Sequence, residues 1–228
     1  MASVTPVVHP DDALTSALSY PAGVTLCRQG EPIREVFHIQ RGLVKLMRVN
    51  STGKERIVGL RSAGWFVGAA AVILGEPAAA TAVTLTAAEM SRICATIFRQ
   101  RLQSDIDLSW RIHHMHSREI DVDLIESGDL HAIRSRDRLL AFLRALPSTP
   151  GGAIGGHRVI LPLRQWELSQ LLGMTAPYLC RLLRDLEREG TLCRHGSAFV
   201  LPEGGVPSAP RVRLRPVLQK VEAGGFGA

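Results

Sequence analysis

The chain has 228 residues, enough for one large domain or two small ones. Its 46% hydrophobic and 21% charged residues are typical of a globular protein and exclude a disordered or fibrous chain. No apolar run approaches the ~20 residues that cross a bilayer, and residues 1–10 lack the basic and apolar segments of a secretory signal. The 4 cysteines, widely spaced and without a CxxC pair, argue against a disulfide framework or a zinc ribbon. We therefore expect a soluble, cytoplasmic protein.

The net charge of +6 is unevenly distributed along the chain. Residues 1–127 carry 13 Lys and Arg against 13 Asp and Glu, whereas residues 128–228 carry 14 basic against 8 acidic residues. A neutral first part and a basic second part suggest a sensing or scaffolding domain joined to a domain that meets a polyanion. A net charge of this size is also common for solubility, so the charge alone does not decide between the two explanations.

Short apolar segments separated by glycine-bearing turns run from residue 23 to about residue 97. Glycine supplies a positive φ at no steric cost, so Gly42 and Gly53 are expected where strands turn. This pattern predicts an antiparallel sandwich or barrel. The expected strands are residues 36–39, 43–49, 56–60, 82–85 and 89–93.

A long helix is predicted over residues 104–127, with Ser104 or Asp105 as its cap. At about 22 residues it would be ~33 Å long. A seam on so long a helix favours pairing with a second copy, and the alternative is that the seam packs on its own domain. The seam consists of Leu108, Ile112, Met115 and Val122, with Glu119 at the one position that breaks the pattern.

The segment after this helix has the order of a winged helix-turn-helix. Residues 127–129 are expected to end the long helix and a second helix to span 130–146. A loop is expected at residues 147–152. The last residues, 203–228, predict a flexible basic tail rich in Pro and Gly.

The helix-turn-helix itself is expected between residues 165 and 189. Gly173 can turn the chain after a first short helix, and Thr175 can cap the second helix. A hairpin turning at His195–Gly196 follows as the wing. The second helix of such a unit enters the DNA major groove with its N-terminus first.

Residues 175–181 would therefore face base edges, and Arg181 is placed to donate two hydrogen bonds to guanine, worth ~1–3 kcal/mol of discrimination. Other basic side chains can contact phosphates and set the register. The predicted DNA contacts are Arg164, Gln165, Thr175, Ala176, Pro177, Tyr178, Cys180, Arg181, Arg184, Arg194 and His195.

These residues resemble a known family. The stretches 161–165 and 180–190 look like the winged-helix domain of the Crp/Fnr transcription regulators. The front half is similar to their cyclic-nucleotide-binding-type β-roll, through Gly30-Glu31 and the stretches 37–44, 64–68 and 97–100.

The resemblance covers about residues 15–202 and implies an α+β fold in three parts: a β-roll over 1–103, a dimerisation helix over 104–127 and a winged helix over 128–202. It also implies the partners: double-stranded DNA with a two-fold symmetric site, a second copy of the chain, and RNA polymerase.

The front half departs from the family members that bind cyclic nucleotides. In those, a Glu after the phosphate-loop glycine binds the ribose and a downstream Arg-Ser or Arg-Thr holds the phosphate. Here Ala69 follows Gly68, and Ala80-Thr81 stands at the second place. A buried phosphate would lack a cation, so we expect no binding of cAMP or cGMP. By the resemblance, the degenerate effector pocket comprises Trp65, Val67, Gly68, Ala69, Ala80, Thr81, Asp123 and Leu124.

Other cofactors of the family are not expected either. Oxygen-sensing members hold an iron–sulfur cluster on cysteines near the N-terminus, and this chain has no cysteine before Cys27. His113, His114 and His116 would gather imidazoles in a symmetric dimer, which leaves haem or a metal as an alternative, but no Cys or carboxylate stands in ligand spacing beside them. We predict no metal and no cofactor.

The second helix of the helix-turn-helix has its own departures. Pro177 stands where many members carry a Glu that reads cytosine, so the family's common half-sites cannot be transferred. Cys180 stands where many carry Ser, next to Arg181 and four residues before Arg184. Nearby cations lower the pKa of a thiol, so a further hypothesis is that oxidation of Cys180 switches DNA binding.

The sequence therefore predicts a homodimeric, sequence-specific DNA-binding transcription regulator. Its roll binds no effector or responds to an unidentified signal, a redox or gas signal included. No paired carboxylates, nucleophile–base motif or phosphate loop point to an enzyme. The alternative is a ligand-binding module whose basic half contacts RNA or an acidic protein.

Overall fold

The computed structural model describes residues 17–129, 135–146, 148–150 and 156–202, and for 121–129, 149 and 150 it describes the backbone alone. The predicted tail, 203–228, lies outside the described residues. In this part the chain separates into two compact units, one of residues 17–44 and 62–115, the other of 45–61 and 116–202. Among the described residues, no helix is both long and apolar enough to cross a membrane.

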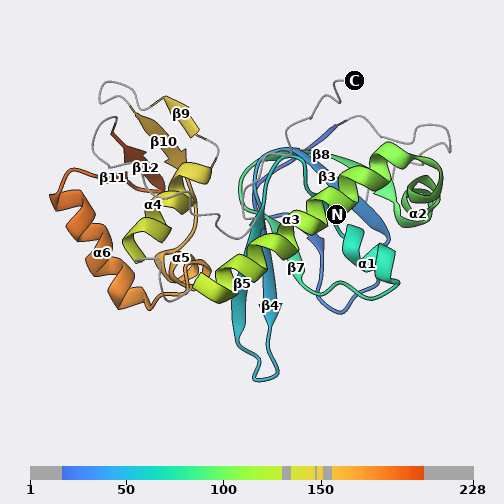
Figure 1. The fold of residues 1–228 in the computed structure, drawn as a ribbon, viewed down its shortest axis with the longest axis horizontal. Helices are drawn as coiled ribbons and strands as arrows, with labels where there is room; N and C mark the ends of the chain where they lie inside the picture. Colours follow the sequence, from blue (N-terminus) through green and yellow to red (C-terminus); the bar gives the residue numbers. More distant parts are fainter. Residues whose placement is uncertain (1–16, 130–134, 147, 151–155, 203–228) are drawn as a thin grey trace, which may run out of the picture. The chain divides into compact units, whose positions relative to one another are not determined.

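The front of the chain folds into short strands and three helices (Figure 1). The strands are β1 (Leu18–Tyr20), β2 (Thr25–Cys27), β3 (Glu35–Arg41), β4 (Val44–Val49), β5 (Glu55–Arg61), β6 (Phe66–Val67), β7 (Thr81–Thr84) and β8 (Ala88–Cys94). The helices are α1 (Ala69–Leu74), α2 (Ala95–Ser104) and α3 (Ile106–Asp129).

These strands form two four-stranded sheets, with the strand orders β1-β8-β3-β6 and β2-β7-β4-β5. The longest ladder is antiparallel and pairs β3 with β8, from Glu35 opposite Cys94 to Arg41 opposite Glu89. At the tight turn after β3, Gly42 has φ +92°, and a Cβ there would lie 2.5 Å from the carbonyl oxygen of Ala87, so only glycine fits. The sheets confirm the predicted β-roll, and their apolar faces form its core.

Helix α3 uses its most regular apolar stripe within a single chain. Leu108, Ile112 and Met115 are 8%, 2% and 3% exposed. These side chains are therefore not available to a second copy, and their assignment to the dimer interface is corrected in favour of the alternative, packing on the chain's own domain. The side chain of Val122 lies outside the described residues.

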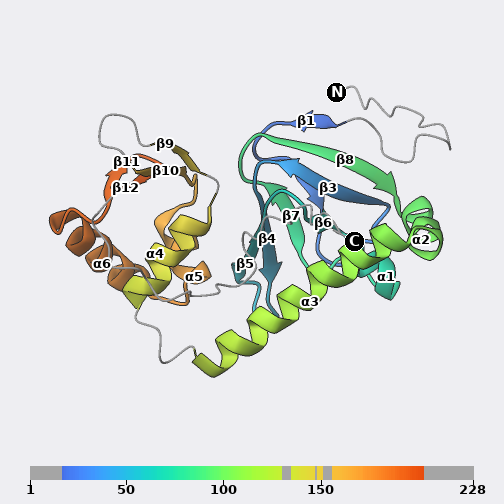
Figure 2. The ribbon, with the colours of Figure 1, turned by 45° about the horizontal axis from the view of Figure 1, so that its top comes forward.

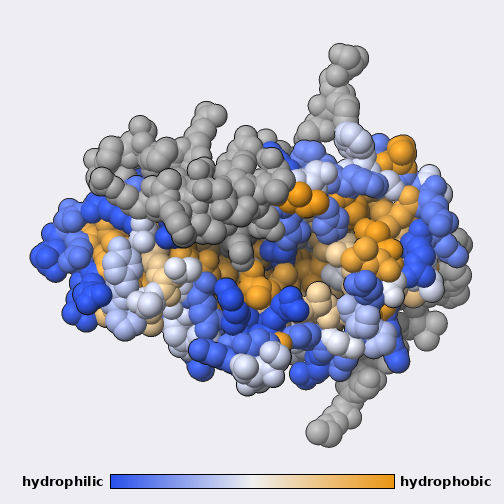
Figure 3. Space-filling model, turned by 60° about the horizontal axis from the view of Figure 1, so that its bottom comes forward, coloured by the Kyte–Doolittle hydropathy of each residue, from blue (hydrophilic) through white to orange (hydrophobic). Residues whose placement is uncertain are grey.

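The outward face of α3 carries a second stripe of apolar side chains, which was not predicted. Ile106, Trp110 and Ile120 are 78%, 59% and 60% exposed. Together with exposed His113 and Ser117 they stand four, three, four and three residues apart, which is the spacing of a coiled-coil seam. Exposed hydrophobic side chains interrupt the hydrophilic surface on the face drawn in Figure 3.

Two predicted boundaries, at the end of α3 and at residues 147–152, need correction. The helix does not end at Ser127–Gly128 but continues through both residues to Asp129 as one uninterrupted rod (Figure 2). The predicted loop at 147–152 contains the strand β9 (Ser148–Pro150), which pairs with His157–Val159. Backbone pairing outweighed the turn signal of Ser and Pro there, since Pro150 stands at the strand's end, where no ladder donor is lost.

The winged helix-turn-helix follows the predicted order. Its elements are α4 (Ser135–Ala145), β9, β10 (His157–Ile160), α5 (Gln165–Leu171), α6 (Ala176–Arg188), β11 (Cys193–His195) and β12 (Ala198–Leu201). The four strands form one sheet in the order β11-β12-β10-β9. The wing turns at Gly196, which has φ +61°.

Candidate functional site

Helix α5 and the turn after it are held by specific hydrogen bonds. Glu167 is buried, and its Oε2 accepts the backbone N–H of Arg164 at 2.7 Å while its Oε1 lies 3.0 Å from Lys45 Nζ. Gly173 turns the chain with φ +61°. The hydroxyl of Thr175 accepts the backbone N–H of Tyr178 at 3.4 Å, so Thr175 caps α6 as predicted. Trp166 on α5 is 39% exposed.

Helix α6 is amphipathic. Leu179, Leu183 and Leu186 are 0%, 1% and 0% exposed and fix the helix in the core of its unit. Tyr178 and Arg181, which come from the first two turns, point away from that core and are exposed. The buried leucines thus orient the helix, and the opposite face is left for a partner.

The predicted DNA-contacting residues fall into two groups. The exposed ones are Arg164, Gln165, Thr175, Pro177, Tyr178, Arg181, Arg184 and His195. The partly buried ones are Ala176, Cys180 and Arg194. With Arg164 and Gln165 at the start of α5 and the others on α6 or the wing, they form three clusters around one helix-turn-helix.

Carboxylates occur only in the second half of α6, and each has a cationic partner. Asp185 accepts from Arg188 Nη2 at 2.8 Å, and Glu187 accepts two hydrogen bonds from Arg194, at 2.7 and 2.8 Å. The Arg194 guanidinium lowers the pKa of Glu187. Among the described residues no carboxylate lies within ion-pair distance of Arg181 or Arg184. Arg181 and Arg184 are therefore the cations of α6 that have no counter-ion within the described part of the chain.

This pairing changes the role of Arg194. A side chain held by two charge-assisted hydrogen bonds ties the wing to α6 and would give up both bonds to reach a phosphate. We therefore treat Arg194 as a residue that positions the wing. Only its three-dimensional pairing with Glu187, seven residues earlier, could have revealed this.

Cys180 lies on α6 beside a guanidinium. Arg184 Nη2 is 3.2 Å from its Sγ, and this hydrogen bond lowers the pKa of the thiol. The structure thus brings together the thiol and Arg184, one of the two arginines that follow it in the sequence.

The turn at Gly68, which the family resemblance assigns to phosphate binding, keeps a tight glycine backbone but lacks the charged side chains. Gly68 caps α1 with φ +90°, and a Cβ there would lie 3.2 Å from Ile33 Cγ2 and 3.3 Å from the carbonyl oxygen of Glu35. Ala69 is fully buried, and the Thr81 hydroxyl already accepts the backbone N–H of Gln29 at 3.0 Å. The residues at 69 and 80 are alanines and offer neither the carboxylate nor the guanidinium that would hold a cyclic nucleotide.

The remaining residues of the predicted effector pocket add no charge where their side chains are described. Trp65 and Val67 are 4% and 6% exposed and belong to the core. Asp123 and Leu124 lie in α3, and their side chains lie outside the described residues.

A charged cluster joins β5 to α3 and was not predicted. Arg61 at the end of β5 forms an ion pair with Glu119, and His116 Nδ1 lies 3.6 Å from the second oxygen of Glu119. Burial alone would raise the pKa of Glu119, but the His116 ring and the Arg61 guanidinium bring it below its ordinary value. A Cβ on Gly59 would lie 2.9 Å from Arg61 Nη1. The break in the apolar pattern at Glu119 was the one signal of this pair in the sequence.

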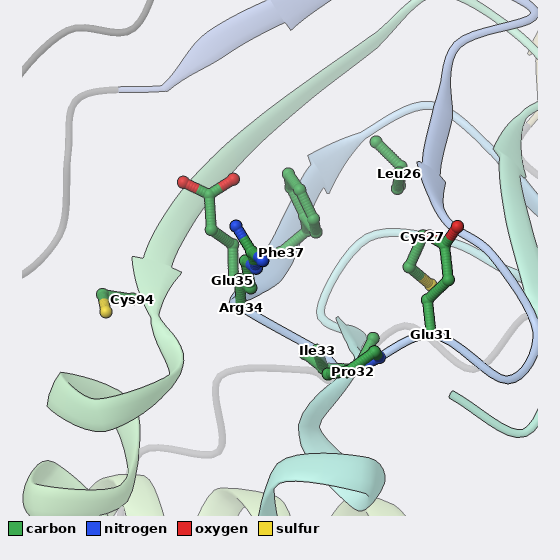
Figure 4. Close-up of a pocket in the computed structure, with 9 residues that line it drawn as sticks. All are labelled: Leu26, Cys27, Glu31, Pro32, Ile33, Arg34, Glu35, Phe37 and Cys94. Carbon is green, nitrogen blue, oxygen red and sulfur yellow. The ribbon is translucent and has the colours of Figure 1, made fainter. Parts of the chain in front are cut away.

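The two cysteines of the roll line one cavity of about 670 Å³ from different strands (Figure 4). Cys27 lies on β2, where burial raises the pKa of its thiol, and Cys94 lies at the end of β8, where the Thr96 hydroxyl lowers it. Figure 4 shows the two thiols on opposite sides of the cavity. Within the described part of the chain, no three His, Cys, Asp or Glu side chains are grouped to hold a metal ion.

Comparison with known proteins agrees with both parts of this structure. Residues 17–105 match the model of the cyclic nucleotide-binding domain, and residues 137–203 match that of the Crp-like helix-turn-helix domain. The cAMP-activated global transcriptional regulator CRP of Salmonella typhimurium is 26% identical over 80% of this chain and 87% of its own.

Two solved structures share the fold. FixK2 from Bradyrhizobium japonicum has a TM-score of 0.66 at 19% identity, covering 91% of this chain and 98% of its own. The c-di-GMP responsive global regulator CLP of Xanthomonas campestris has a TM-score of 0.63 at 21% identity, covering 83% and 94%. With the roll, the long helix and the winged helix in the same order, the chain belongs to the Crp/Fnr family of transcription regulators.

Proposed function

We propose that the protein is a homodimeric regulator that reads a two-fold symmetric DNA site with the first two turns of α6. The observation that carries this is the charge pattern of α6: exposed Arg181 and Arg184 without internal counter-ions, and carboxylates confined to the second half and paired. Cations that are not neutralised within the protein are the ones that bind a polyanion.

Within this face the contacts can be assigned by reach. Arg181 would donate two hydrogen bonds to a guanine. Arg164 at the start of α5 and His195 on the wing flank α6 and would contact phosphates. Pro177 cannot read cytosine, so the site differs from those read by relatives with a Glu there.

Two copies would pair through the exposed stripe of α3, formed by Ile106, Trp110 and Ile120. Burying large apolar side chains stabilises association by ~1.5–3 kcal/mol each. A symmetric pair would place two reading helices about one turn of DNA apart. Contact with RNA polymerase is an expectation from the family.

The relative named above is cAMP-activated, and we propose that this chain is not. Ala69 and Ala80 remove the two groups that would hold a cyclic nucleotide, and the Arg61–Glu119 pair joins β5 to α3 without one. The protein would then be competent to bind DNA without cAMP or cGMP, with the oxidation of Cys180 as a modulating signal.

The test is selection from random DNA with purified protein and no added ligand. A two-fold symmetric consensus is expected. Arg181→Ala should weaken binding to it about ten- to a hundredfold, whereas Arg144→Ala, at an exposed arginine of α4, should leave it unchanged. Enrichment of single-stranded or structured RNA in a parallel selection, with no DNA consensus, would instead support the alternative partner.

A further inference from the structure

A second cavity lies away from the DNA-contacting residues and the predicted effector pocket. It is bounded by one face of the β1-β8-β3-β6 sheet and by the corner at which α2 gives way to α3. Its volume of about 420 Å³ falls within the range of small-molecule sites. None of the residues assigned above to DNA contact or to the effector pocket lines it.

One wall of the cavity is a pair of stacked rings. The His38 and Phe66 rings are nearly parallel, at 19°, with centroids 4.3 Å apart. Burial and the nearby Arg111 guanidinium lower the pKa of His38 to about 4, so the imidazole is neutral at pH 7. Ile93 and Leu108 add apolar surface. An uncharged, largely aromatic wall of this kind favours a flat ring.

The cavity also holds two cations. Arg111 lies with its guanidinium carbon 5.6 Å from the centre of the Phe66 ring, and Arg101 comes from the last turn of α2. Neither makes an ion pair with any described residue.

Two carboxylates line the same cavity but are tied to the start of α3. Asp105 Oδ1 accepts the backbone N–H of Leu108 at 2.9 Å, and Asp107 stands in the first turn. A helix N-terminus stabilises nearby negative charge. Asp105 is thereby engaged at the start of α3, whereas neither guanidinium of this cavity forms an ion pair with a described residue.

The far edge offers hydrogen bonds of both kinds. Gln40 Nε2 donates to Ser91 Oγ at 2.7 Å. This arrangement leaves the serine hydroxyl hydrogen and the glutamine carbonyl oxygen for a ligand.

We propose that this cavity binds a small ring-bearing carboxylate, its ring against the His38–Phe66 wall and its carboxylate between Arg101 and Arg111. The guanidinium fork matches a carboxylate in shape and charge. A doubly charged phosphate fits less well, because Asp105 and Asp107 repel a second negative charge. The bound acid would connect the roll to the first turn of α3, and any consequence for DNA binding rests on the function proposed above.

Calorimetry with the purified full-length protein, without DNA, tests the site. Phenylacetate is expected to bind saturably with a Kd of about 1 mM. Phenylacetamide, which lacks the charge, and acetate, which lacks the ring, should each bind at least tenfold more weakly. Arg111→Gln should weaken phenylacetate at least tenfold, whereas Arg28→Gln, at an exposed arginine outside the cavity, should bind as the wild type does.

Three results would overturn the proposal: no saturable binding of phenylacetate, equal binding of phenylacetate and phenylacetamide, or equal affinity of Arg111→Gln and Arg28→Gln. Arg101→Gln supplies an independent variant should Arg111→Gln not fold. Because DNA is absent, a failure of the regulator to select a DNA site leaves this result unaffected.

Discussion

Helix α6 and the turn at Gly68 in the roll differ in their charged side chains. Helix α6 presents Arg181 and Arg184 to solvent, and neither forms an ion pair with a described residue. After Gly68 the turn carries Ala69, which is fully buried and uncharged, and elsewhere Arg61 is paired with Glu119. An unpaired cation marks a surface that meets a polyanion, and a paired one marks a structural connection. Under the proposed function, α6 would recognise DNA and the turn at Gly68 would serve as scaffold.

The largest effect should come from disrupting the proposed dimer, in which two copies of α6 would read the two half-sites. Trp110→Glu replaces a large apolar side chain on the exposed stripe of α3 with a carboxylate, which in a two-fold dimer faces its own copy. The dimer dissociation constant should rise at least a hundredfold, measured by analytical ultracentrifugation. Trp110→Phe keeps an aromatic ring and should remain dimeric. Unchanged association of Trp110→Glu would show that another surface pairs the copies.

The next effect tests whether the Arg61–Glu119 pair is a structural connection. Arg61→Met leaves the partly buried Glu119 without its guanidinium partner, and the free energy of unfolding should fall by about 2 kcal/mol. The double variant Arg61→Met/Glu119→Gln should lose less than the sum of the two single variants, as measured by urea denaturation. Strict additivity would mean that the pair contributes nothing to stability.

A smaller effect concerns the pH dependence of the roll. The pKa of His38 is about 4 in the folded chain and close to 6.5 in the unfolded chain. As pH falls from about 6.5 to 4 the unfolded state takes up the proton first, so stability is complete at neutral pH and is lost across this window.

After allowance for partial exposure, His38 should account for about 1–2 kcal/mol of unfolding free energy between pH 7 and pH 4.5. The variant His38→Gln, which does not titrate, provides the reference. Parallel pH profiles of the two proteins would contradict the assignment to this residue.

Much of this comparison could be predicted from sequence, because the elements concerned carry local signals. The cap at Thr175, the turn at Gly173 and the leucine spacing of α6 defined the reading helix and its exposed face. The alanines at positions 69 and 80 are read directly from the sequence, and the absence of cyclic-nucleotide binding that we expect from them stays a prediction.

The sequence did not show which of two surfaces of an element faces the core, nor which partner a charged side chain has. Helix α3 carries two apolar stripes, and only packing against the chain's own residues shows that Leu108 faces inward and Trp110 outward. From its place in the wing, Arg194 was predicted to contact a phosphate, yet it is hydrogen-bonded to Glu187 and ties the wing to α6. Glu119 was visible in the sequence only as a break in the apolar pattern. Nothing in the sequence linked it to Arg61, which lies 58 residues away.

The smallest effect concerns Cys180, the one oxidisable thiol on α6. Arg184 lowers the pKa of the Cys180 thiol, which favours the reactive thiolate. An oxidised sulfur beside Arg184 would hold this guanidinium against the protein and away from a phosphate. Peroxide should therefore weaken DNA binding a few-fold, reversibly with a thiol reductant. Cys180→Ser should bind DNA equally well before and after peroxide, as measured by fluorescence anisotropy, while Cys193→Ser should stay as sensitive as the wild type. If Cys180→Ser loses affinity with peroxide as the wild type does, then the charge face of α6 is not under redox control and its cations are committed to DNA alone.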